Sequence, residues 1–290
     1  MKVLILVNNL HHKNLNFIMK CKNIKFTIIN SVNEINNYNL NEFDAVMSPS
    51  EPINVSKYPG VKFIFGPQFS VFPDNRLNII KSPNSVYNLL SEWVVDVWKQ
   101  YEICSNLKLI CLPFGVDTDK FINKKNISER SEVFIYFKHR NPQDLHIVEQ
   151  FLKNKHVSYK IFSYDSRYDE NSYLNCLQNA KYGIWVDAHE SQGFALQEAL
   201  SCNVPLLVWG IQSMNQEFRS RYPNYTATTT SYWDNSCGEK FHNEFELEET
   251  YNMFINNIEN YNPRKFIVDN LSVEMCENKL IETINNMNIS

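Results

Sequence analysis

Two glutamates, Glu190 and Glu198, are separated by seven residues and stand on either side of a turn that contains Gly193. The stretch 182–209 predicts a buried strand, a polar loop, a helix that begins at Phe194 and a second strand. Glu190 therefore falls at the carboxyl end of a strand, where open α/β sheets bind their ligands. Glu198 lies one to two turns into the helix, about 7 Å further along its axis.

The start of this helix, at Gly193, Phe194 and Ala195, predicts an anion site. Backbone N–H groups at a helix N-terminus point outward and lie at the positive end of the dipole. A diphosphate bound there could offer a ribose to one glutamate and a sugar to the other. The alternative is that Glu190 is an ordinary loop acid and Glu198 an exposed helix residue, because an E-x7-E spacing is frequent by chance.

The residues around the two glutamates resemble the donor-site signature of retaining nucleotide-sugar glycosyltransferases of family 4, which have the GT-B architecture. The usual wording of that signature is close to E-G-x-G-x-x-x-x-E-A-x-A-x-G-x-P-V. The positions that match here are Glu190, Gly193, Glu198, Ala199 and Pro205, and the departures are Ser191, Ser201 and Asn203. Asn203 is a mild change, since asparagine can adopt the left-handed conformation of a helix end. Ser191 is a greater one and puts the contacts to the sugar hydroxyls in doubt.

A second match begins at Pro113 and runs through Asp117 to Phe121. It resembles the P-N-G-V-D-x-x-x-F segment that closes the N-terminal domain of the same family, and it is also the pattern of a turn that begins at a proline. The polar run 124–131 follows as a linker. The resemblance covers residues 107–260, and the first 100 residues only by strand order. It implies an acceptor domain over 1–125 and a nucleotide-sugar donor domain over 126–290.

Alternation of strands with helices or loops predicts an α/β fold of the GT-B type, with two doubly wound, Rossmann-like domains that face each other across a cleft. In this architecture a C-terminal helix often crosses back to the first domain, and 271–287 is the candidate. A cap signal at Ser82 and Pro83 predicts a long helix to about Tyr101. The expected strands are 1–8, 25–30, 43–48, 61–66, 77–80, 107–112, 132–137, 158–162, 183–186 and 206–209.

Lys138 and Arg140 follow the predicted strand 132–137. The resemblance implies that a basic pair near this point grips the donor diphosphate. Arginine offers a bidentate fork and lysine a point charge to a leaving phosphate. The alternative is a solvated basic turn, and the spacing is tighter than in the family. With Glu190 beside the sugar, these three residues form the predicted catalytic set.

The remaining donor-side candidates surround that set. Tyr164 is expected to stack on the base, with a simply packed aromatic as the alternative, and His189 to touch the sugar, with a structural histidine as the alternative. The irregular stretch 210–241 is longer than ordinary connections and is of the kind that is often functional. The donor-binding residues predicted are Tyr164, His189, Ser191, Gln192, Gly193, Phe194, Ala195 and Glu198.

Acceptor-side candidates lie on loops of the first domain that are expected to face the cleft: His11, His12, Gln68 and Asp74. Adjacent histidines invite a metal site, but no third ligand has a recognisable spacing. We therefore expect no metal, and no tightly bound cofactor.

Composition limits the partners. The 290 residues are 43% hydrophobic and 21% charged, with a net charge of −4, as in a soluble globular protein. This balance gives no general attraction to nucleic acid or anionic membranes, so we expect no nucleic-acid partner and at most peripheral membrane contact. Seven scattered cysteines without a C-x-x-C pair, no signal segment and no long apolar run predict a cytoplasmic protein.

Together these observations predict a metal-independent hexosyltransferase that moves a sugar from a UDP- or GDP-sugar to a glycan, lipid or protein-linked glycan, with retention of configuration implied by the resemblance. One alternative is a GT-B-shaped protein that binds nucleotide sugars without turnover. Another is an unrelated two-lobed α/β enzyme or ligand binder in which E-x7-E is accidental. The oligomeric state cannot be read from the sequence.

Overall fold

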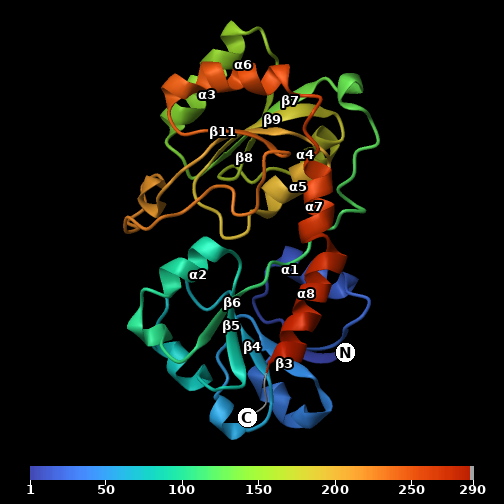
Figure 1. Cartoon of the computed structure of the whole chain (residues 1–290), viewed down its shortest axis with the longest axis vertical. Helices are drawn as coiled ribbons and strands as arrows, with labels where there is room; N and C mark the ends of the chain where they lie inside the picture. The colour runs from blue at the N-terminus through green and yellow to red at the C-terminus, as the bar shows by residue number, and fades with distance from the viewer. Residues whose placement is uncertain (288–290) are drawn as a thin grey trace. The chain divides into compact units, whose positions relative to one another are not determined.

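The computed structural model describes residues 1–287 and divides into two compact units, each built on its own parallel sheet (Figure 1). Unit 1 contains residues 1–115 and the C-terminal segment from Leu271 onward. Unit 2 contains residues 116–270. The predicted pair of Rossmann-like domains is confirmed.

The sheet of unit 1 is entirely parallel, in the order β2-β1-β3-β4-β5-β6. Its strands are β1 (Lys2–Leu6), β2 (Lys25–Ile29), β3 (Ala45–Ser48), β4 (Phe63–Phe65), β5 (Ser85–Leu89) and β6 (Lys108–Cys111). Two α-helices, α1 (His12–Lys20) and α2 (Glu92–Trp98), connect strands of this unit. The other connections carry short 3₁₀ turns at Val32–Asn37, Leu40–Glu42, Val55–Lys57 and Asn75–Ile80, and a further turn at Glu102–Cys104 follows α2.

The fifth strand is not where the sequence predicts it. Residues 75–80 form a 3₁₀ turn, and the strand is β5, in the first part of the predicted long helix. All five of its residues are buried, and it pairs with β4 and β6. The Asn88 side chain accepts the N–H of Leu112 at 2.8 Å and donates to its carbonyl at 2.9 Å. Pairing in the centre of a sheet thus overrides the local helix signal of Ser82 and Pro83.

The last helix, α8 (Val273–Asn286), belongs to unit 1, as predicted for a C-terminal helix that crosses back (Figure 1). The buried Glu277 carboxylate accepts the backbone N–H groups of Asn23 at 2.6 Å and Ile24 at 2.9 Å. Lys62 donates to the carbonyl of Ile284 at 2.7 Å. These bonds join α8 to the residues that directly precede β2 and β4.

The sheet of unit 2 is also parallel, in the order β11-β10-β9-β7-β8. Its strands are β7 (Glu132–Lys138), β8 (Lys160–Ser163), β9 (Ala180–Asp187), β10 (Leu206–Trp209) and β11 (Gly238–Phe241). Its helices are α3 (Pro142–Asn154), α4 (Glu170–Leu177), α5 (Phe194–Ser201), α6 (Leu247–Asn256) and α7 (Pro263–Leu271). Shorter 3₁₀ turns lie at Ile127–Glu129, Met214–Gln216 and Glu244–Glu246.

Residues of β7 and β9 alternate between the two faces of this sheet. Ile135 and Ile184 belong to the apolar cluster that α3 and α6 cover (Figure 1). On the other face the rings of Tyr136 and Trp185 stack at 4.0 Å, and Tyr173 of α4 packs beside Tyr136. The last residues of β7 and β9, Lys138 and Asp187, lie on this second face.

The boundary between the units differs from the predicted 125/126 division. Residues 116–125 belong to unit 2, because Phe121 accepts hydrogen bonds from Ser201 at 2.7 Å and Arg264 at 3.1 Å, and Asn123 donates to Leu177 at 3.1 Å. The change of unit therefore falls inside the 113–121 segment rather than in the polar run that follows it. The predicted second domain of 126–290 also includes α8, which is part of unit 1.

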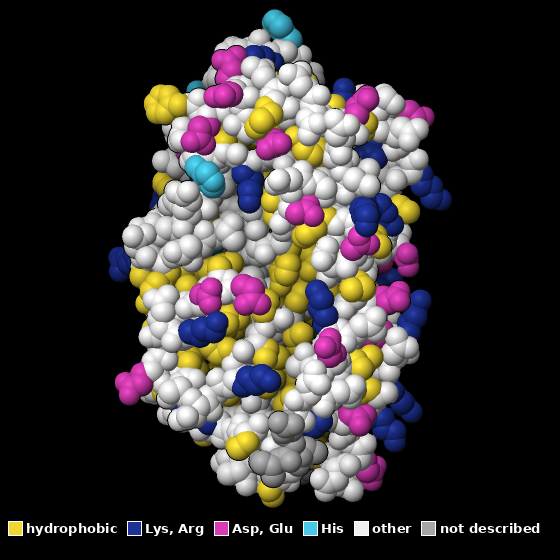
Figure 2. Space-filling model, in the orientation of Figure 1, with side chains coloured by type: hydrophobic (Ala, Val, Ile, Leu, Met, Phe, Trp, Pro, Cys, Tyr) yellow, Lys and Arg dark blue, Asp and Glu magenta, His cyan; other side chains and the backbone are white. Residues whose placement is uncertain are grey.

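Figure 2 shows acidic and basic side chains interspersed over the visible face. Within residues 1–287 no helix has the length and apolar character needed to cross a bilayer. The seven cysteines are free thiols, five of them buried: Cys104, Cys176, Cys202, Cys237 and Cys276.

Candidate functional site

The strand order of unit 2 creates a topological switch point between β7 and β9, the position at which doubly wound sheets bind ligands. Lys138, the last residue of β7, is the register partner of Asp187, the last residue of β9. Strand alternation puts both residues on the face that carries Tyr136 and Trp185. A cation and a carboxyl group therefore end two neighbouring strands side by side.

Glu190 completes this arrangement from the loop after β9. Its Oε1 accepts a hydrogen bond from Lys138 Nζ in an ion pair whose side chains are 16% (Lys138) and 17% (Glu190) exposed. Burial by itself lowers the pKa of Lys138, but the acidic groups around it, Glu190 first and then Asp187, together outweigh burial and raise that pKa above its ordinary value. The lysine is thus held as a cation at the switch point.

The irregular segment after β10 fixes the backbone of Glu190. The Glu190 N–H donates to Thr228 O at 3.1 Å, and the Glu190 carbonyl accepts from the Ser231 hydroxyl. The Thr229 hydroxyl donates to Asp187 O at 3.3 Å. These contacts tie the stretch 210–241 to the loop of Glu190 through threonines and a serine that the sequence did not single out.

Helix α5 begins at Gly193, which adopts the left-handed conformation with φ 82°. A Cβ on Gly193 would lie 3.5 Å from Glu190 Cβ, so space alone does not demand glycine, but the backbone conformation does. Phe194 and Ala195 are half-buried in the first turn. The predicted helix start is confirmed, and it lies next to the Lys138–Glu190 pair.

Arg140 does not face the same way as Lys138. Its side chain is 7% exposed; Nε and Nη2 bind the Asp144 carboxylate at 2.9 and 2.8 Å, and Nη1 donates to Trp209 O at 3.0 Å. The guanidinium also lies 5.2 Å from the centre of the Trp209 ring. These contacts engage the Arg140 guanidinium within unit 2, and its assignment to a diphosphate stays a prediction.

Glu198 and Gln192 are also more enclosed than predicted, each 3% exposed. Gln192 donates from Nε2 to Gln197 Oε1 at 3.1 Å and accepts from Gln197 at its carbonyl, so it braces the start of α5. Burial raises the pKa of Tyr168 to about 12, and the Glu198 carboxylate nearby adds to that shift. Glu198 therefore lies on the inner side of α5, whereas Ser191 is exposed.

Tyr164 lies beside Lys138, and its stacking on a base stays a prediction. Its side chain is 50% exposed, and Lys138 Nζ lies 4.7 Å from the ring centre. The His139 ring meets it edge-on at 5.5 Å. An exposed aromatic face beside the cation is the geometry that a stacking ligand requires.

His189 is held from the other side by Glu217, whose Oε2 lies 3.1 Å from His189 Nε2. Burial lowers the pKa of His189 below its ordinary value, against the opposing effect of Glu217. The same glutamate lies 3.6 Å from His139 Nδ1, and Tyr222 packs on the His189 ring at 5.2 Å. His189 thus joins the segment 210–232 to the loop that carries Glu190.

Asp187 and Glu217 belong to the site, although the sequence prediction did not include them. For Asp187 a signal existed: a carboxylate ends an otherwise apolar strand, three residues before Glu190. Glu217 carries no comparable signal, because it reaches the site through a long irregular connection.

The acceptor-side candidates are spread over unit 1. His11 caps α1 by accepting the Lys13 N–H at 3.3 Å, and its ring lies 4.4 Å from that of His12. Gln68 Oε1 accepts from Ser50 at 3.2 Å. Asp74 caps the 75–80 turn and forms a salt bridge with Arg76 at 2.7 Å. His11, His12 and Gln68 keep their place at the carboxyl ends of strands, whereas Asp74 is accounted for by its local partners.

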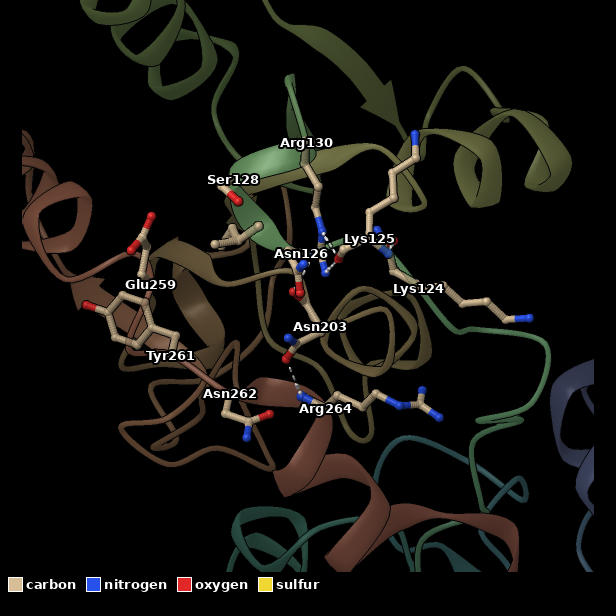
Figure 3. A pocket seen from close by; sticks show the side chains of 12 residues that line it. Lys124, Lys125, Asn126, Ser128, Arg130, Asn203, Glu259, Tyr261, Asn262 and Arg264 are labelled. Carbon is tan, nitrogen blue, oxygen red and sulfur yellow. Dashed lines mark hydrogen bonds between the residues drawn. The ribbon is translucent and has the colours of Figure 1, made fainter.

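A polar pocket of about 470 Å³ lies elsewhere in unit 2 (Figure 3). Arg130 donates to Asn203 O at 2.7 Å, Arg264 donates to Ser201 O at 2.7 Å, and Asn203 Oδ1 accepts the Arg264 N–H at 3.2 Å. Asn203 is left-handed, with φ 54°, as predicted. The pocket therefore surrounds the capped carbonyl end of α5, opposite the helix start. Its lining residues are 123–128, Arg130, Asn203, Glu259, 261–262 and Arg264.

Among residues 1–287 no group of three or more histidine, cysteine or acidic side chains is arranged to hold a metal ion.

The solved structures that share this fold include two glycosyltransferases. The lipopolysaccharide outer core galactosyltransferase WaaB, in its apo form, is 12% identical with a TM-score of 0.55, over 98% of this chain and 99% of that chain. The sucrose-phosphate synthase from Thermosynechococcus elongatus is 8% identical with a TM-score of 0.51, over 84% of this chain and 73% of that one. At these identities the likeness establishes the fold, two parallel-sheet Rossmann-like domains as in GT-B structures.

No family model and no curated protein matches the sequence. Membership of glycosyltransferase family 4 therefore stays a prediction from the residues around Glu190 and Glu198.

Proposed function

We propose that this chain is a glycosyltransferase that moves a sugar from a nucleoside-diphosphate sugar to a hydroxyl group of an acceptor such as a glycan or a lipid. The observation that carries the proposal is the Lys138–Glu190 pair at the switch point of unit 2, beside the start of α5. The GT-B fold shared with two glycosyltransferases supports it.

The diphosphate is assigned to the start of α5, where backbone N–H groups and the helix dipole favour anions. As the bond from the anomeric carbon to the leaving phosphate breaks, negative charge builds on that phosphate. Lys138 would stabilise it as a fixed cation close by. This role needs the lysine to be shared between Glu190 and the phosphate, because Arg140 is occupied elsewhere.

Glu190 is assigned to the sugar. A carboxylate held by Lys138 and by the backbone contacts of its own loop can accept hydrogen bonds from sugar hydroxyls and oppose the positive charge that develops at the anomeric carbon. Retention of configuration, a hexose as the transferred group, and UDP or GDP as the nucleotide come from the family resemblance and are part of the proposal.

Tyr164 is assigned to the base, on which its exposed ring would stack. Glu198 is assigned to the ribose hydroxyls. Because Glu198 is 3% exposed, ribose binding requires the side chains around it to open. No metal ion or tightly bound cofactor is part of the proposed reaction.

The test is thermal stability of the protein against UDP, GDP, ADP and their sugars, for wild type, E198A and the control E248A, which removes an exposed glutamate of the same unit that is paired with Lys155. We expect one nucleotide to raise the melting temperature of wild type and E248A but not of E198A. No shift with any nucleotide at about millimolar concentration would contradict the proposal.

A second candidate function is nucleotide-sugar binding without turnover. The observation that favours it is the inward orientation of Arg140, which leaves Lys138 without the second cation expected of the family. Hydrolysis or transfer measured with the sugar nucleotide that stabilises the protein separates the two candidates, because only the enzyme releases the nucleoside diphosphate.

A further inference from the structure

Asp187 carries a buried carboxyl group in unit 2 that has no role in the proposed reaction. The residue is 0% exposed, and its Oδ1 accepts the N–H of Ala188 at 2.7 Å. Its Oδ2 is buried as well and receives no hydrogen bond from any donor among residues 1–287. A buried carboxylate oxygen without a donor is costly, so its charge state needs an explanation.

The groups that face Asp187 account for this orphaned oxygen. The carboxyl of Glu190 lies beside it, the Lys138 cation is on the neighbouring strand, Arg140 donates to the Asp187 carbonyl at 3.3 Å, and the Tyr136 side chain is on the same sheet face. Lys138 is bound to Glu190. What Asp187 meets is therefore a second carboxyl group, and two carboxylates can only accept; a proton between them turns the contact into a hydrogen bond.

We infer that Asp187 is a positioning residue of the donor site, a neutral carboxylic acid that donates its proton to Glu190 and fixes the Glu190 carboxylate against Lys138. Asp187 rather than Glu190 holds the proton because Asp187 is fully buried, whereas Glu190 has a cationic partner and some exposure to solvent. Its role in sugar transfer rests on the proposed function, but its charge state does not.

The electrostatics support this assignment. Burial first, and then the neighbouring Glu190 carboxylate, raise the pKa of Asp187 well above its ordinary value. With Asp187 neutral, Lys138 and Glu190 sum to zero charge. With Asp187 ionised, the three groups would sum to −1 next to the start of α5 and would repel a diphosphate. The proton thus keeps the switch point acceptable to an anionic donor.

The charge state can be measured without substrate. In wild type labelled with ¹³C at aspartate carboxyls, we expect one signal, assigned by its loss in D187N, to keep the shift of a protonated acid between about pH 5 and pH 8. A signal that titrates near the ordinary aspartate range, about pH 4, would overturn the inference.

The positioning role is tested by comparing D187N with D187A. Asparagine keeps an N–H donor toward Glu190 and an acceptor for Ala188, whereas alanine keeps neither. We expect transfer by D187N within about threefold of wild type, and a fall in kcat of roughly tenfold to a hundredfold in D187A with a smaller change in the donor KM. Equal losses in both variants, or no loss in D187A, would contradict the role.

These two tests separate the inference from the proposed function. If no nucleotide stabilises wild type, the function fails, while the carboxyl signal of Asp187 still decides its charge state. If nucleotides bind and the signal titrates as an ordinary aspartate, the function stands and the inference falls. Thermal unfolding of D187N and D187A without ligand shows that both variants are folded before kinetics are compared.

Discussion

The two units have the same strand order up to the extra strand of unit 1, yet their switch points carry different chemistry. In unit 2 a lysine and a carboxyl group end the two neighbouring strands, and Glu190 joins them in a largely buried cluster. In unit 1 the equivalent loops bring Asn8 to Glu51 through a hydrogen bond, with His11 exposed nearby. The same backbone plan thus supports a largely buried charge cluster in one unit and a partly exposed polar edge in the other.

The difference comes from what covers each edge. In unit 2 the segment 210–232 closes over the loop of Glu190 through Thr228 and Ser231, and burial strengthens the ion pair beneath it. In unit 1 the connections are mostly short 3₁₀ turns, and the polar side chains stay partly exposed. A closed, charged edge suits the binding of an anionic donor, and an open polar edge suits the proposed hydroxyl acceptor.

Loss of the Lys138 cation should have the largest effect on the activity of unit 2. K138M keeps much of the side-chain volume but leaves Glu190 without its partner and the leaving phosphate without a cation. We expect transfer to fall by about 10²- to 10³-fold in kcat/KM, the range found when one stabilising donor of a transition state is removed. Steady-state kinetics measure this. K155M, which removes a surface lysine paired with Glu248, is the control and should keep wild-type rates.

The pH dependence of stability should expose the buried acid. Because folding raises the pKa of Asp187 above the ordinary value of 3.8, the folded state keeps a proton that the unfolded chain releases. Its contribution to stability is complete below that value and is lost as the pH rises toward the folded pKa. D187N should therefore gain on wild type by about 1.4 kcal/mol per pH unit in this window. Urea unfolding at several pH values measures the gap, and a constant gap would contradict the expectation.

Unit 1 should be sensitive at its helix α8 rather than at its open edge. E277A leaves the N–H groups of Asn23 and Ile24 without their acceptor in a buried place. We expect a loss of about 1–3 kcal/mol in the free energy of unfolding. Hydrogen exchange localises it: amides of unit 1 should exchange faster and those of β7 and β9 should not. E274A, at an exposed position of the first turn of α8, provides the comparison variant.

The smallest expected effect is that of the Glu190 charge on nucleotide affinity. E190Q removes the negative charge opposite Lys138 and keeps a side chain of the same length, so the net charge of the cluster becomes positive. Affinity for the nucleoside diphosphate should rise by several-fold, up to about tenfold, although sugar transfer falls. Titration calorimetry with the nucleotide that stabilises wild type measures the change. Weaker binding would mean that Glu190 supports the diphosphate rather than competing for Lys138.

Much of unit 2 could be predicted, because β7, β9 and β10 are largely apolar runs with clear ends. Strand β11, with the sequence GEKF, is missed, because it lies inside the stretch 210–241 that is expected to be irregular. The strand before Asp187, the helix start at Gly193 and the left-handed Asn203 follow from local sequence, and the GT-B fold follows from the alternation. The orientation of Arg140 does not. Simple alternation would put Lys138 and Arg140 on one face, but His139 between them is left-handed, with φ 52°, and turns the guanidinium inward.

The misplaced fifth strand and the misplaced unit boundary also depend on contacts between residues far apart in the sequence. The cap signal of Ser82 and Pro83 predicts a helix where sheet pairing makes β5. The boundary between the units depends on where Phe121 and Asn123 find partners far along the chain. The proton on Asp187 is a property of three groups brought together by two strands and a loop, and a linear pattern does not contain it.

Helix α8 also sets an order of events during synthesis on the ribosome. Unit 2 is one continuous segment, so it can complete its sheet as soon as residue 270 has left the exit tunnel. Unit 1 begins the chain, but the acceptor for the Asn23 and Ile24 amides is Glu277, which is made some 250 residues later. The first of the two units to be translated is therefore the second to be finished. Its six strands lie within residues 2–111, but until α8 is made the unit stays incomplete, and it is the part of the nascent chain that most needs protection from aggregation.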